Sequence, residues 1–250
     1  MHNSARGAKA CGGGSGSRVK HVQLNRDVMA AAKSGDDEQL CTLVAKQWQD
    51  FDAVNAATAY QKLLLMRTAR HTRLQQDAGH APLSARDKML AILKPVLCEQ
   101  HIPVFSARLC ANMLHTLAKI WCRQPCTDML RALEARVLAV CGDFEPQHVA
   151  NILWAFVTLR HQPSKELVGG LQVRAVALRI DFIPQAIANT LWAFAALRLP
   201  PNEALVAGLI ERAVLVQDDF NDTSTPRRLP TRCGHLRRWG CSPARSSWQG

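Results

Sequence analysis

A sixteen-residue segment occurs twice in the chain, and this duplication limits what the chain can fold into more than any other feature. The copies are FEPQHVANILWAFVTL at residues 144–159 and FIPQAIANTLWAFAAL at residues 182–197, which start 38 residues apart. Self-similarity at a fixed period of about 20 to 50 residues is typical of proteins built from repeated structural units. The duplication therefore favours an array of similar units.

Two further segments follow the same pattern with fewer matches. FSARLCANMLHTLAKI occupies residues 105–120, and FDAVNAATAYQKLLLM occupies residues 51–66. The two start 54 residues apart, so we expect an insertion in this unit, which we place in the polar stretch at residues 67–84. The sequence thus predicts an array over residues 21–225, with repeats near residues 51–104, 105–143, 144–181 and 182–219.

Each unit is predicted to form two helices. In the two clearest units the first helix is expected to begin at Pro146 or Pro184, because proline suits the first helical turn, and apolar residues follow three and four apart. The second helix is expected to follow a turn and a residue whose side chain caps the first turn. The expected capping residues are Asp36, Ser84, Thr127, Ser164 and Asn202.

A helix pair of this length cannot bury its own apolar stripe, and stacking against neighbouring pairs supplies the missing cover. We therefore predict an all-α fold, a right-handed α-solenoid of roughly 38-residue two-helix repeats with disordered N- and C-terminal tails. No stretch of the chain reaches the length of apolar sequence that a membrane-spanning helix needs, so we expect no membrane insertion.

The basic charge of the chain belongs to its two ends. The formal net charge is +11, of which residues 1–20 contribute +4 and residues 226–250 contribute +6, so the body between them carries about +1. Residues 1–20 are Gly/Ser-rich and free of acids, which predicts a basic disordered tail or an organelle transit segment. A nearly neutral body is typical of helical scaffolds that bind proteins.

Residues 226–250 are predicted to be a disordered basic tail that arises from a frame-shifted repeat. When ordinary codons for Pro226 to Gly250 are read from the third base of the Pro226 codon, a permitted product is SQIANTLWALATLGVFACEELVAG. Its first half repeats the IANTLWA segment of residues 187–193, and its second half matches ELVGG at residues 166–170 and ALVAG at residues 204–208. We therefore expect that the six arginines of this tail are not a designed RNA-binding patch.

The motif F-x-P-Q-x-x-A-N-x-L-W-A-x-x-x-L resembles the octotricopeptide-repeat family, and it is similar to the helical repeats that precede the RAP domain in organelle RNA-processing proteins. The resemblance is carried by residues 143–219, extends to residues 104–142, and reaches residues 18–103 with fewer matches. It implies an α-solenoid that binds single-stranded RNA in a mitochondrion or plastid (chloroplast) and acts in RNA processing, stability or translation.

Three pairs of polar residues, spaced four apart on the first helices, are the first RNA-binding candidates: Arg108 and Asn112, Gln147 and Asn151, and Gln185 and Asn189. They can form a ladder that faces the bases, or the amides can bond the backbone of a neighbouring repeat. Residues that differ between units would better explain sequence reading, namely His115, His148 and Lys119.

Two arginines and two tryptophans complete the candidate set. Arg160 and Arg198 end first helices at the same repeat position, where they can meet phosphate or interact with the helix C-terminus. Trp154 and Trp192 can stack on bases or pack in the core.

The sequence supports two classes of function. The motif favours an RNA-binding helical-repeat protein, and the nearly neutral body favours a protein-protein interaction scaffold of TPR/HEAT-like type. We do not expect an enzyme, a cofactor, a metal site or a small-molecule substrate. The nine cysteines show no zinc-binding spacing, the histidines are dispersed, and no Gly-rich phosphate loop occurs.

Overall fold

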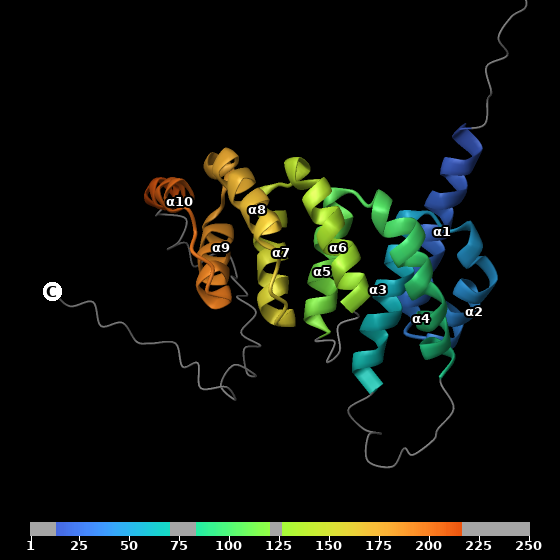
Figure 1. Cartoon of the computed structure of the whole chain (residues 1–250). Coiled ribbons are helices and arrows are strands. Elements are labelled where there is room, and N and C mark those ends of the chain that lie inside the picture. The colour runs from blue at the N-terminus through green and yellow to red at the C-terminus, as the bar shows by residue number, and fades with distance from the viewer. Residues whose placement is uncertain (1–13, 71–83, 121–126, 217–250) are drawn as a thin grey trace, which may run out of the picture.

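A computed structural model of the chain describes residues 14–70, 84–120 and 127–216, and these residues form ten α-helices (Figure 1). The odd-numbered helices correspond to the predicted first helices: α1 (Gly14–Ser34), α3 (Ala53–Arg70), α5 (Ala107–Lys119), α7 (Pro146–Leu159) and α9 (Pro184–Leu197). The even-numbered helices correspond to the second: α2 (Asp37–Gln47), α4 (Ala85–Val96), α6 (Thr127–Ala139), α8 (Lys165–Ala177) and α10 (Glu203–Leu215).

The helices pack against their second neighbours in chain order. α1 packs on α3, α3 on α5, α5 on α7 and α7 on α9, while α2 packs on α4, α6 on α8 and α8 on α10. Figure 1 shows the resulting row, which runs from α1 and α2 at one end to α9 and α10 at the other. This all-α architecture, with its alternating packing, suggests helical repeats.

Each of the first helices α3, α5, α7 and α9 is preceded by a short 3₁₀ turn and a phenylalanine. The turns are Trp48–Asp50, Ile102–Val104, Cys141–Asp143 and Arg179–Asp181. The phenylalanines that follow them, Phe51, Phe105, Phe144 and Phe182, are all buried. These phenylalanines thus mark the point where each of these four helix pairs anchors its start in the core.

The predicted helix starts are confirmed in most places. α7 and α9 begin at Pro146 and Pro184. The side chains of four expected caps accept backbone N–H groups in the first turns of the second helices: Asp36, Ser84, Ser164 and Asn202. Thr127 differs, because α6 begins at Thr127 itself, so this residue lies inside the first turn and not at the capping position.

Two expected boundaries also differ. α1 begins at Gly14, inside the segment predicted to be a disordered tail at residues 1–20. α3 continues to Arg70, inside the insertion predicted at residues 67–84. Residues 67–70 contain no glycine or proline that would end the helix. The remaining insertion residues 71–83, the N-terminal residues 1–13 and the predicted frame-shifted tail lie outside the described residues.

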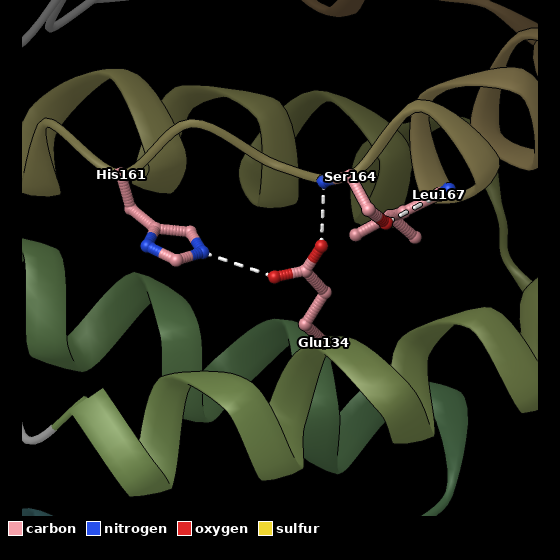
Figure 2. Close-up of polar contacts among 4 residues, drawn as sticks. All are labelled: Glu134, His161, Ser164 and Leu167. Atoms are coloured by element: carbon pink, nitrogen blue, oxygen red, sulfur yellow. Dashed lines mark hydrogen bonds and ion pairs between the residues drawn. The ribbon is translucent and has the colours of Figure 1, made fainter.

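In two places, a side chain of one second helix accepts a backbone hydrogen bond from the turn that precedes the next second helix; Figure 2 shows the first of them. Glu134 of α6 points toward the turn between α7 and α8, where one carboxylate oxygen accepts the backbone N–H of Ser164 at 2.6 Å and the other lies 3.0 Å from Nε2 of His161. The equivalent residue of α8, Gln172, accepts the backbone N–H of Asn202 at 2.7 Å. In both cases the contact reaches the residue that caps the next second helix.

No helix in the described part of the chain is long and apolar enough to cross a membrane.

Candidate nucleic-acid interface

Four positions on each first helix form a stripe at the surface. On α5 these are Arg108, Asn112, His115 and Lys119, spaced four, three and four apart, which is the spacing of one helix face. His115 is half-buried and the other three are exposed. The residues between them are the ones that pack inward, including Cys110, Ala111, Met113 and Leu114.

The same stripe recurs on the next two first helices. On α7 it consists of Gln147, Asn151, Trp154 and Thr158, and on α9 of Gln185, Asn189, Trp192 and Ala196. All eight side chains are exposed or half-buried. Because α5 packs on α7 and α7 packs on α9, the three stripes lie side by side. We call these twelve residues the ladder face.

The ladder face combines constant and variable positions. Its second position is asparagine in all three helices, while its first changes from arginine to glutamine and its fourth from lysine to threonine to alanine. The matching stripe of α3 is less polar, since it holds Val54, Thr58, Gln61 and Leu65. Positively charged groups of this surface are therefore concentrated on α5.

The amides of the ladder face lie at the surface. Nε2 of Gln147 donates a hydrogen bond of 2.9 Å to Oδ1 of Asn151 on the same helix. Within residues 14–70, 84–120 and 127–216, none of the three asparagines forms a hydrogen bond with the backbone of a neighbouring helix pair. Asn112 is exposed, and Asn151 and Asn189 are half-buried.

The third position of the ladder face forms a row of rings. The imidazole of His115 and the indole of Trp154 meet across α5 and α7, with centroids 5.2 Å apart and planes tilted by 53°. Trp154 is half-buried and also packs against the core, whereas Trp192 is 43% exposed. Trp154 thus combines packing contacts with partial exposure, whereas Trp192 is an exposed aromatic residue.

The pKa of the histidine in this row is lowered from its ordinary value, which favours the uncharged ring. Burial lowers the pKa of His115, and the nearby ammonium group of Lys119 lowers it further. A neutral imidazole avoids repulsion by Lys119 and can stack on a neighbouring ring. The positive charge at this end of the ladder face therefore comes from Arg108 and Lys119.

His148, a predicted RNA-reading residue, has a structural contact outside the ladder face. Its Nδ1 accepts the backbone N–H of Glu145 at 3.2 Å, and its ring meets the edge of Phe144 at a centroid distance of 6.2 Å. Burial lowers the pKa of His148; the Glu145 carboxylate raises it in part and Arg108 lowers it. The neutral ring thereby completes the N-terminal cap of α7.

Arg160 and Arg198 end α7 and α9 in the left-handed conformation, with φ angles of 54° and 55°. The backbone N–H of the residue after each arginine bonds the carbonyl five residues earlier, as His161 does to Phe156 and Leu199 does to Phe194. Glycine normally takes this position because it has no Cβ. Both arginines are exposed and lie two residues beyond the last ladder position.

The described residues contain no group of three or more histidine, cysteine, aspartate or glutamate side chains that could hold a metal ion. Thr158 and Ala196 belong to the ladder face but were not among the residues expected from the sequence. The signal that could have found them is the spacing of four, three and four, which extends from α5 to the other first helices.

No protein-family model matches the chain, and a search of curated proteins finds no match.

Proposed function

We propose that this protein is an α-solenoid of roughly 38-residue two-helix repeats that binds single-stranded RNA in a mitochondrion or plastid and acts in RNA processing, stability or translation. The observation that carries the proposal is the ladder face, where equivalent residues of three neighbouring first helices line up at the surface. The motif resemblance stated above points to the same ligand.

The chemistry of the ladder face suits unpaired bases. Side-chain amides can pair with the donor and acceptor groups of base edges, and bases of single-stranded RNA can stack on aromatic rings. Gln147, Asn151 and Trp154 place these two kinds of group on one face of one helix. If one base is held on α7, the nucleotides before and after it in the RNA would lie within reach of α5 and α9.

Phosphate contacts are assigned to the cationic ends of the ladder face. Arg108 lies at the first position of α5 and Lys119 at its last, while Arg160 and Arg198 lie beyond the ends of α7 and α9. Cationic side chains that neutralise phosphates supply a salt-dependent share of the affinity. His148 is assigned to the cap of α7 and contributes to binding only by placing that helix.

The test measures the affinity of the full chain for a fluorescein-labelled, random-sequence single-stranded RNA by fluorescence anisotropy at several salt concentrations. A variant in which the six arginines of residues 226–250 are replaced by serine removes the contribution of the tail. The proposal expects this variant to retain salt-dependent binding. Loss of all binding in this variant would contradict the proposal and favour the protein-binding scaffold.

The ladder face is tested on this tail variant with substitutions that copy a neighbouring helix pair. Arg108→Gln copies Gln147, and Lys119→Thr copies Thr158. Together they should weaken binding roughly tenfold and reduce the slope of log affinity against log salt by about 1.4, or about 0.7 for each phosphate contact. The matched control, Arg131→Gln with Lys165→Thr, removes the same charge from exposed positions on α6 and α8 and should leave the slope nearly unchanged.

A further inference from the structure

Two apolar positions that recur on α5, α7 and α9 are buried on the first two of these helices but not on the third. Ala111 and Leu114 of α5 are fully buried, and so are the equivalent residues Ala150 and Leu153 of α7. The equivalent residues of α9, Ala188 and Leu191, have the same chemical identity but a different environment. Ala188 is exposed and Leu191 is only half-buried.

The exposed positions of α9 are the ones whose equivalents in α5 and α7 are buried. Elsewhere on α9, Ala186, Ile187 and Ala193 are buried. α9 packs on α7 and lies at the end of the row (Figure 1). Ala188 and Leu191 are therefore uncovered because no further first helix packs on α9 among the described residues.

α10 extends this uncovered surface. Ile210 is 54% exposed and Val214 is 61% exposed, whereas the equivalent residues of α8, Gln172 and Val176, are 8% exposed and half-buried. We call the surface formed by Ala188, Leu191, Trp192, Ile210 and Val214 the end face.

We propose that the end face is an interface for one further helix pair that carries the same motif and continues the chain. α9 retains alanine and leucine at the two positions that are buried in both preceding first helices, α5 and α7, each of which packs on a further first helix. A helix that ended the row in solvent would have no need for these apolar residues, because terminal units of repeat arrays normally have a polar outer face.

The sequence identifies the occupant. The product SQIANTLWALATLGVFACEELVAG, which one choice of ordinary codons for residues 226–250 permits in another reading frame, carries the alanine, leucine and tryptophan of the first helix and then the start of a second helix. Residues 226–250 in the frame as written carry none of this pattern. The end face is thus fitted to a helix pair of the chain's own kind.

The experiment compares the full chain with a graft variant in which residues 221–250 are replaced by a second copy of residues 183–219. This copy follows Phe220 in the same way that residues 183–219 follow Phe182. Covering the end face should raise the thermal unfolding midpoint by roughly 5 °C. It should also slow amide hydrogen exchange in α9 and α10 by about tenfold or more, measured by mass spectrometry.

The control substitution is Ala188→Glu, made in both proteins. In the full chain it should change the midpoint by less than about 2 °C, because Ala188 is exposed and glutamate suits a helix surface. In the graft variant it places a charge in the new interface and should abolish the added exchange protection. A second graft, in which the shifted-frame product replaces residues 226–250, should protect α9 to a smaller extent because its second helix is incomplete.

Two results would overturn the proposal. One is a graft variant whose helices α9 and α10 exchange as fast as those of the full chain. The other is self-association of the full chain, measured by sedimentation, that Ala188→Glu abolishes, since this would make a second copy of the chain the occupant of the end face.

Discussion

The side chain of Arg174 reaches from α8 to the start of α7, where its Nε donates a hydrogen bond of 2.8 Å to the carbonyl oxygen of Phe144. This carbonyl precedes the helix in an extended segment and has no helical partner. The same bond recurs in the adjacent helix pairs, from Arg136 to Phe105 at 2.8 Å and from Arg212 to Phe182 at 3.0 Å. In each of these three pairs, one arginine thus ties the second helix to the start of the first.

Replacing this arginine should destabilise the protein. Arg174→Met keeps most of the aliphatic stem but leaves the Phe144 carbonyl without its donor, and we expect a loss of about 1–2 kcal/mol in the free energy of unfolding. Urea denaturation measures this loss. Arg131→Met, at an exposed position of α6, is the control and should cost less than about 0.5 kcal/mol. Equal losses for the two variants would mean that the contact between Arg174 and the Phe144 carbonyl contributes nothing to the free energy of unfolding.

The contact between Glu134 and the next turn should make stability depend on pH. Burial raises the pKa of Glu134, but the hydrogen bonds from His161 and from the Ser164 backbone outweigh it, so the pKa lies below its usual value of 4.5. A carboxylate whose folded pKa is depressed adds stability above its unfolded pKa, and this stability is lost as pH falls through the folded pKa.

Glu134→Gln tests this dependence, because it copies the glutamine that makes the equivalent contact in α8. The difference in unfolding free energy between the protein and this variant should shrink as pH falls below about 4.5. Urea denaturation between pH 3 and pH 6 measures it. A difference that stays constant over this range would show that the carboxylate charge is not involved.

The local parts of this architecture could be predicted from the sequence, because they depend on residues close together in the chain. Ser164 and Asn202 follow prolines and precede apolar residues at helical spacing, so their capping role is visible in the sequence. The pairs that begin with Arg108, Gln147 and Gln185 lie on surface faces because a four-residue spacing defines a helix face.

The contacts between helix pairs could not be predicted in the same way. The Glu134 contact with Ser164 spans 30 residues and depends on how one pair sits on the next. The contact of His148 with the Glu145 backbone depends on a side-chain rotamer that the motif does not specify. Ala150 and Ala188 occupy the same motif position but only Ala150 is buried, because burial there is decided by the neighbouring helix pair.

Thr190 is a polar residue in an apolar position. It is fully buried in α9 and its Oγ1 has no hydrogen-bond partner, while the equivalent residues Met113 and Ile152 are apolar. Thr190→Val has nearly the same shape and removes the unpaired hydroxyl, so we expect a gain of about 1 kcal/mol or more in unfolding free energy. Thermal and urea unfolding measure it, with Thr158→Val at the half-buried surface as the control. A loss of stability would mean that the hydroxyl finds a partner in solution.

Arg198 should show opposite effects on stability and on binding. Its backbone has a φ angle of 55°, a conformation that disfavours residues with a Cβ, so Arg198→Gly should stabilise the protein by up to about 1 kcal/mol. If the guanidinium contacts phosphate, the same variant should bind single-stranded RNA more weakly and with a salt slope smaller by about 0.7. Arg198→Gln separates the two effects, because glutamine carries no charge but keeps a Cβ and so gains none of the stability expected for glycine. A glycine variant that gains stability and binds RNA with an unchanged slope would limit the role of Arg198 to ending α9.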